Sequence, residues 1–259
     1  KKLFQTIGNI IVLIEKDDIP KYLLFLENAF PYMDNYNYHK GMNGIIQELT
    51  GLLKTKNIGT DSDRALLLDF QATLETKPEK AIKLEKDALA QIENITADNA
   101  RLVSNLHANL GGLYRMNGHP DLAREHMEKS ISLLDQFNLL HINDSIPQIA
   151  NYAMFLTEQQ EPERGISELQ KLSGIIKEYH SDDCLDYAKV QETLGTIYLM
   201  TANLPQAKTH FKRAFKIYEK IWTDEPEMIE AKYQEIQELY PQVGFFLGQQ
   251  LSDFLTKQT

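Results

Sequence analysis

The chain has 259 residues, a length that fits one large domain or two smaller ones and is ample for a hydrophobic core. Its 27 basic and 37 acidic residues give a net charge of −10, which disfavours nucleic acid as a partner. Only 13 Gly and 9 Pro occur, so the composition favours long helices. Cys184 is the only cysteine, which excludes an intramolecular disulfide and predicts a reducing, cytoplasmic location.

The first 60 residues contain three segments with helical spacing of apolar residues, at 2–15, 20–30 and 38–54. The longest apolar run, at 10–14, is far shorter than the roughly 20 residues that span a bilayer, so we expect no membrane segment. The chain begins at Lys1 rather than Met, which we interpret as an excerpt of a longer protein.

From residue 61 onward, equivalent residues return at a constant interval of 42. Helices that pack at the low end of the 8–10 Å range need a residue without bulk where their backbones cross. Small residues recur in this way at Ala81, Ala123, Gly165 and Ala207. Two further sets with the same interval are Leu68, Leu110, Tyr152 and Leu194, and Asp69, Gly111, Ala153 and Gly195. We therefore expect each interval to supply its own helix–helix contact points.

Each interval is predicted to hold two antiparallel helices. Residues 102–117 and 120–137 carry apolar residues at helical spacing, and the segment 117–120, with Gly118 and Pro120, separates them. The same turn chemistry recurs at Pro78, Pro162 and Pro205. Proline is tolerated in the first helical turn because its missing N–H needs no partner there.

The recurring residues resemble the tetratricopeptide repeat. The best instances are Leu110, Gly111 and Tyr114 followed by Ala123, and Leu194, Gly195 and Tyr198 followed by Ala207, Phe211 and Ala214. The interval is 42 residues rather than the usual 34, so the chain looks like the longer-helix variant of kinesin light chains and of sensor modules in some bacterial signalling ATPases. The resemblance implies an all-α right-handed superhelix, or solenoid, of about six antiparallel helix pairs that binds proteins.

The resemblance divides the chain into three parts. Residues 1–60 form a degenerate N-terminal repeat, 61–222 hold four repeats of 42 residues, and 223–259 form a C-terminal capping pair with helices at 225–240 and 242–257. The second repeat departs from the pattern, with Asp69 in place of Gly and Ala72 in place of Tyr. The apolar cluster at 245–247 is either the closing contact of the last pair or a patch for a missing segment.

Motifs for catalysis, phosphate binding or metal binding are absent from the sequence, so we expect no enzyme activity, no metal site and no cofactor. His126 and His210 occupy the same repeat position but lie two repeats apart, too far to share a metal ion. We interpret His119 and His126, which are seven residues apart, as a solvated pair. The acidic surroundings of Cys184 disfavour a reactive thiolate.

Solenoids use their concave face for binding, and the resemblance assigns that face to the first helix of each repeat. The predicted groove combines apolar side chains, Met among them, with a few polar residues. Its candidate partner-binding residues are Phe70, Asn105, Arg115, Met116, Met154, Glu158, Lys189, Glu192, Thr196 and Met200. The Lys, Asn and Arg clamp with which some tetratricopeptide modules hold acidic chaperone tails is missing, so we expect an apolar or weakly basic polypeptide segment.

Three functions compete at this point. The first is a protein–protein interaction scaffold that binds a peptide or protein segment in its groove. The second is an effector-sensing or peptide-sensing module of a larger regulatory protein, such as a signalling ATPase or a transcription regulator. The third, an enzyme with a site before residue 61, is disfavoured because no nucleophile, metal set or phosphate loop is visible. The sequence leaves a homo-oligomer open.

Overall fold

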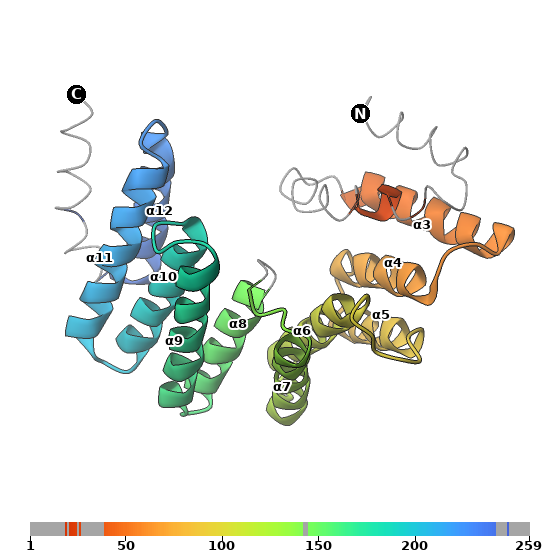
Figure 1. Ribbon diagram of the computed structural model, residues 1–259, viewed down its shortest axis with the longest axis horizontal. Helices are drawn as coiled ribbons and strands as arrows, with labels where there is room; N and C mark the ends of the chain where they lie inside the picture. Colours follow the sequence, from red (N-terminus) through yellow and green to blue (C-terminus); the bar gives the residue numbers. More distant parts are fainter. Residues whose placement is uncertain are drawn as a thin grey trace. The chain divides into compact units, whose positions relative to one another are not determined.

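The computed structural model describes residues 19, 21–24, 26, 39–141, 145–241 and 248, and every regular element in them is an α-helix (Figure 1). The helices are α3 His39–Lys56, α4 Asp61–Thr73, α5 Pro78–Ala90, α6 Ala100–Met116, α7 Pro120–Gln136, α8 Ser145–Glu158, α9 Pro162–Tyr179, α10 Leu185–Met200, α11 Leu204–Ile221 and α12 Pro226–Leu239. The predicted all-α class is confirmed. The helices expected at 2–15 and 242–257, most of the one at 20–30, and the apolar cluster at 245–247 lie outside the described residues.

The chain forms two compact units, residues 1–133 and 134–259, so that the division falls within α7. In the first unit, α4 packs against α3, α5 and α6, and α5 also packs against α6. In the second unit, α8 packs against α9 and α10, α10 packs against α9 and α11, and α11 contacts α12. In both units, the first helix of a repeat thus contacts three others: the second helix of the same repeat, the second helix of the preceding repeat and the first helix of an adjacent repeat. This is the contact pattern of stacked helix pairs.

The helices begin as the turn chemistry predicts. Proline occupies the first turn of α5, α9, α11 and α12, where its missing N–H costs no hydrogen bond. At the start of α4, the hydroxyl of Thr60 accepts from the N–H of Asp63, and the Asp63 carboxylate accepts from the N–H of Thr60. This reciprocal capping box satisfies two backbone donors that have no partner inside the helix.

The first helices α6, α8 and α10 end in one recurring turn. In each, the N–H after the turn residue donates to the carbonyl five residues earlier: His119 to Tyr114 at 2.9 Å, Glu161 to Leu156 at 2.8 Å, and Asn203 to Tyr198 at 2.7 Å. The turn residues Gly118, Gln160 and Ala202 have φ of 75°, 64° and 59°. A left-handed residue with this hydrogen bond is the Schellman helix end. The 42-residue interval is therefore present in the backbone as well as in the side chains.

The small residues lie where the paired helices cross. Ala81, Ala123 and Ala207 are at most 2 % exposed. At Gly165 on α9, a Cβ atom would lie 2.6 Å from the carbonyl oxygen of Ala153 on α8. The two backbones are therefore too close there for any larger residue, and the predicted role of the small residues is confirmed.

Candidate functional site

The first helices of successive pairs form a layer in each unit, which we call the first-helix layer. It consists of α4 and α6 in residues 1–133, and of α8 and α10 in residues 134–259. Packing of first helix against first helix puts side chains of neighbouring pairs on one surface. All ten predicted partner-binding residues belong to these four helices.

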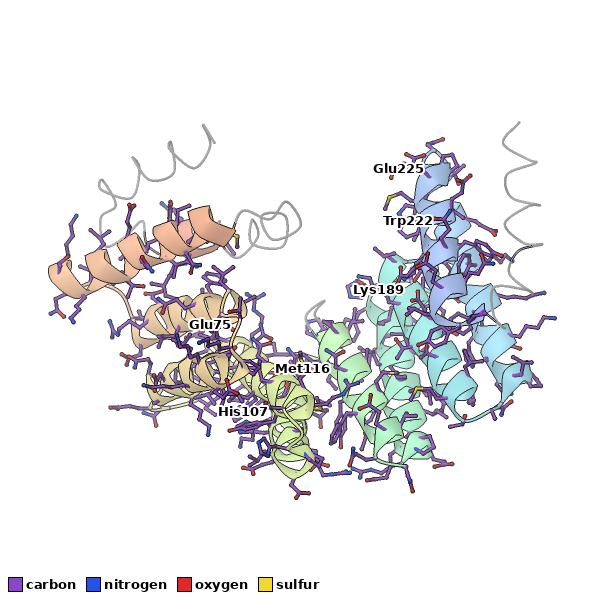
Figure 2. All side chains as sticks on the ribbon, turned by 180° about the vertical axis from the view of Figure 1, so that it is seen from behind. Glu75, His107, Met116, Lys189, Trp222 and Glu225 are labelled. Carbon is purple, nitrogen blue, oxygen red and sulfur yellow. The ribbon has the colours of Figure 1, made fainter. Side chains whose placement is uncertain are left out.

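In the first unit, the layer exposes one large apolar side chain. Met116, in the last turn of α6, is 82 % exposed, the highest value of any large apolar residue described (Figure 2). Asn105 and Arg115 are half-buried on the same helix. Phe70 is buried, because it packs with Leu49 and Leu53 of α3 in the core of the unit. Of the candidates in this unit, Met116 and Arg115 are therefore accessible at the surface, whereas Phe70 is not.

In the second unit, the layer exposes charged residues and one more methionine. Lys189 near the start of α10 is exposed (Figure 2). Glu158 at the end of α8 is exposed as well, and Met200 at the end of α10 is 47 % exposed. Lys189 forms an ion pair with Asp186 at 3.7 Å. The remaining candidates are less accessible: Met154 and Glu192 are half-buried and Thr196 is buried.

Glu192 connects three helices. Its carboxylate accepts from the hydroxyl of Tyr218 on α11 at 2.7 Å and pairs with the ammonium group of Lys232 on α12 at 2.9 Å. Burial opposes the charge on Lys232, but Glu192 and Glu235 outweigh it and raise the pKa of this lysine. Burial and the neighbouring Glu192 raise the pKa of the Tyr218 hydroxyl. Glu192 therefore holds α10 to α11 and α12, a structural role in addition to any contact with a ligand.

A histidine network joins α6 to α7. The Nδ1 atoms of His107 and His126 lie 2.9 Å apart, and the His126 ring stacks on Tyr114 at 5.4 Å. Burial, the neighbouring His126 and Lys129 lower the pKa of His107 to about 4. The interpretation of His126 as one of a solvated pair with His119 is wrong, because its ring is half-buried between helices and bonds to His107 instead.

The same arrangement recurs two repeats later. His210 bonds to Gln191 at 2.9 Å and stacks on Tyr198 at 5.2 Å. Gln191 therefore stands where the earlier repeat has His107. Burial lowers the pKa of His210 as well. Each ring is thus a neutral polar contact between paired helices, which stabilises the hairpin.

Two carboxyl groups are paired inside the first unit. Glu85 on α5 is 1 % exposed and hydrogen-bonds to Asp69 on α4, which accepts from the amide of Asn109 on α6 at 2.8 Å. Burial and the charge of Asp69 raise the pKa of Glu85 far above its ordinary value of 4.5. Glu85 is therefore protonated at neutral pH and shares that proton with Asp69.

The described residues contain no group of three or more His, Cys, Asp or Glu side chains placed to hold a metal ion. None of the helices in the ranges described combines the length and the apolar character that crossing a bilayer requires.

Comparison with known proteins identifies the repeat. The family model of the tetratricopeptide repeat matches residues 145–220, from the start of α8 to the last turn of α11. None of the curated proteins matches the sequence. Repeats of this family are in general protein–protein interaction scaffolds rather than catalysts.

Solved structures share the fold over most of the chain. BtubC (BKLC) from P. vanneervenii superposes with a TM-score of 0.57 at 16 % identity, over 93 % of this chain and 89 % of that one. The TPR-like repeats of a Podosopora anserina kinesin light chain superpose with a TM-score of 0.58 at 14 % identity, over 75 % of this chain and 93 % of that one. Identities this low show the fold alone, and that fold is a tetratricopeptide-like solenoid of helix pairs.

Proposed function

We propose, from the premise that residues 145–220 are tetratricopeptide repeats, that this chain is an interaction scaffold that binds a polypeptide segment along its first-helix layer. One observation carries the proposal. Met116 and Met200 occupy the same repeat position, 84 residues apart, and both remain exposed at the ends of first helices. Methionine adapts its shape to varied side chains, and large exposed apolar residues at equivalent positions favour protein binding.

The charged residues of the layer define the kind of segment that fits. Glu158 occupies the repeat position between the two methionines and is exposed. Arg115 on α6 and Lys189 on α10 are positively charged residues of the layer in their own units, and the chain as a whole has a net charge of −10. Because the chain as a whole is acidic, a segment with apolar side chains and a slight positive charge complements it. The single cysteine supports a cytoplasmic location for the interaction, because cytoplasmic proteins rarely rely on disulfides.

Selection of peptides from a random library on the full chain tests the proposal, followed by fluorescence anisotropy with the peptides recovered. We expect the double change Met116→Lys and Met200→Lys to weaken binding by about tenfold or more, because it puts charge into an apolar contact. The matched control is Leu122→Lys with Ile221→Lys, which changes two exposed apolar residues on the second helices α7 and α11. Recovery of no peptide, or a larger loss in the control, would contradict the proposal.

A further inference from the structure

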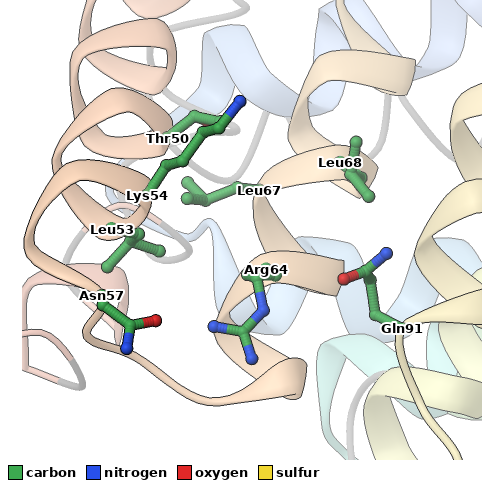
Figure 3. A pocket seen from close by; sticks show the side chains of 8 residues that line it. All are labelled: Thr50, Leu53, Lys54, Asn57, Arg64, Leu67, Leu68 and Gln91. Carbon is green, nitrogen blue, oxygen red and sulfur yellow. The ribbon is translucent and has the colours of Figure 1, made fainter.

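A cavity of about 380 Å³ lies in the first unit where α3, α4 and the end of α5 meet (Figure 3). Three leucines, two cationic side chains and three uncharged polar side chains line it: Leu53, Leu67, Leu68, Lys54, Arg64, Thr50, Asn57 and Gln91. Its volume falls within the roughly 300–1,000 Å³ of small-molecule sites. The cavity lies between α4 and the second helices α3 and α5, and none of the ten candidate partner-binding residues lines it.

The 42-residue interval shows that two of the lining residues replace core residues. Position 64 corresponds to Leu106, Gln148 and Val190 in the later repeats. The two aliphatic residues are 0 % exposed, and Gln148 is 9 % exposed. Position 91 corresponds to Leu133, Ile175 and Ile217. Leu133 and Ile217 are at most 4 % exposed, and Ile175 is half-buried.

Among the four repeats, only this one places polar residues, Arg64 and Gln91, at both positions. The other three have an aliphatic residue at the position of Gln91, and two of them have one at the position of Arg64. Packing of the repeat does not require the exchange, since aliphatic residues serve elsewhere in the same fold.

The lining carries positive charge only. Lys54 has no ion-pair or hydrogen-bond partner among the described residues. The guanidinium group of Arg64 pairs with Asp61, which is not in the lining, and donates to the carbonyl of Gly59 at 3.2 Å. Arginine has five N–H donors, so these contacts leave capacity for an anion. Positive charge beside three leucines therefore matches an anionic group attached to an aliphatic one.

We propose that this cavity binds an aliphatic carboxylate, with the carboxylate at Lys54 and Arg64 and the aliphatic part against Leu53, Leu67 and Leu68. Asn57 and Gln91 supply amide groups for a further polar contact. This chemistry occurs both in free fatty acids and at the C-terminal residue of a peptide that ends in an aliphatic amino acid.

Titration of the full ¹⁵N-labelled chain, followed by NMR, tests the proposal and separates the two sources. Octanoate represents the free acid, N-acetylleucine represents the peptide end, and octanol is the uncharged control. We expect at least one of the two acids to shift the amide signals of residues around the cavity. Octanol should bind with a Kd about tenfold higher, or should show no binding. Binding of only one acid identifies the source and supports the cavity in either case.

Two variants complete the test. Arg64→Leu with Gln91→Leu copies the residues of the next repeat, so binding should be lost while the thermal midpoint stays equal or rises. Lys54→Met should raise the Kd of the bound acid about tenfold, whereas Lys83→Met, an exposed lysine of α5 outside the lining, should leave it unchanged. Failure of both acids to bind, equal binding of octanol, or unaltered binding by the double leucine variant would overturn the proposal.

Discussion

Replacement of Gly165 by alanine tests whether the paired helices are held together at their small residues. Two effects oppose each other. Alanine in place of glycine inside a helix stabilises by about 0.5–1 kcal/mol. The added Cβ, however, would lie 2.6 Å from the carbonyl oxygen of Ala153 and 3.2 Å from its carbonyl carbon and Cα. These are buried backbone atoms, so α8 and α9 must move apart, which costs about 1–3 kcal/mol.

Gly174 on the same helix is the matched control, because a Cβ added there meets nothing within 4 Å. We expect Gly174→Ala to raise the free energy of unfolding by about 0.5–1 kcal/mol. Gly165→Ala should fall below Gly174→Ala by about 1–3 kcal/mol. Urea unfolding followed by circular dichroism at 222 nm measures both. If the two variants are equally stabilised, the helices do not cross tightly at Gly165 and the reasoning is refuted.

Three further variants test the polar contacts between helices. In the unchanged protein, the raised pKa of Glu85 makes the folded state bind one proton more than the unfolded state, so stability falls as pH rises above about 4.5. Glu85→Gln should remove this fall, which urea midpoints measured at several pH values check. An unchanged slope of midpoint against pH would contradict the proton shared with Asp69. The lowered pKa of His107 means that between pH 6.5 and 4 the unfolded state binds one proton more than the folded state, so stability falls as pH falls. His107→Gln should remove this fall, and urea midpoints that are equally acid-sensitive in the variant would refute this. Glu192→Ala should lower the free energy of unfolding by about 1–3 kcal/mol, because Lys232 and the hydroxyl of Tyr218 lose their partner. Thermal melts measure this, and an unchanged stability would show that the contact is weak.

The helix pairs could be predicted because local residues determine them. Proline in the first turn, glycine at the turn and small residues at the crossings each act within one pair, and they recur at a constant interval. Even Gln160 and Ala202 follow Gly118 into the left-handed conformation, although neither residue favours it. The packing of the repeat therefore overrides the local preference of those two residues.

The polar contacts could not be predicted from single positions, because each depends on which side chain lies opposite. Asp69 was visible as a departure from glycine, but its partner Glu85 was not identified. The signal was present in the interval: Gly195 lies against Phe211, and the residues at those two positions in the second repeat are Asp69 and Glu85. Comparing pairs of positions, rather than single positions, would have found the buried carboxyl pair.

The accessibility of the candidate groove residues also depended on packing. Phe70 has the same sequence signature as an exposed groove residue, yet α3 covers it, and Thr196 is buried in α10. Glu192 was expected to face a ligand, and the structure shows that it also pairs with Lys232. The contacts with α3 and α12 that decide these cases come from the flanking parts of the chain, where the repeat pattern is weakest.

Site-specific photocrosslinking tests the binding face most directly. A benzoylphenylalanine introduced at position 116 or 200 on the first helices, or at position 122 or 221 on the second helices, is irradiated with a peptide selected on the full chain. We predict crosslinks to the peptide from positions 116 and 200, and background levels from 122 and 221. Crosslinks only from 122 and 221 would contradict binding along the first-helix layer.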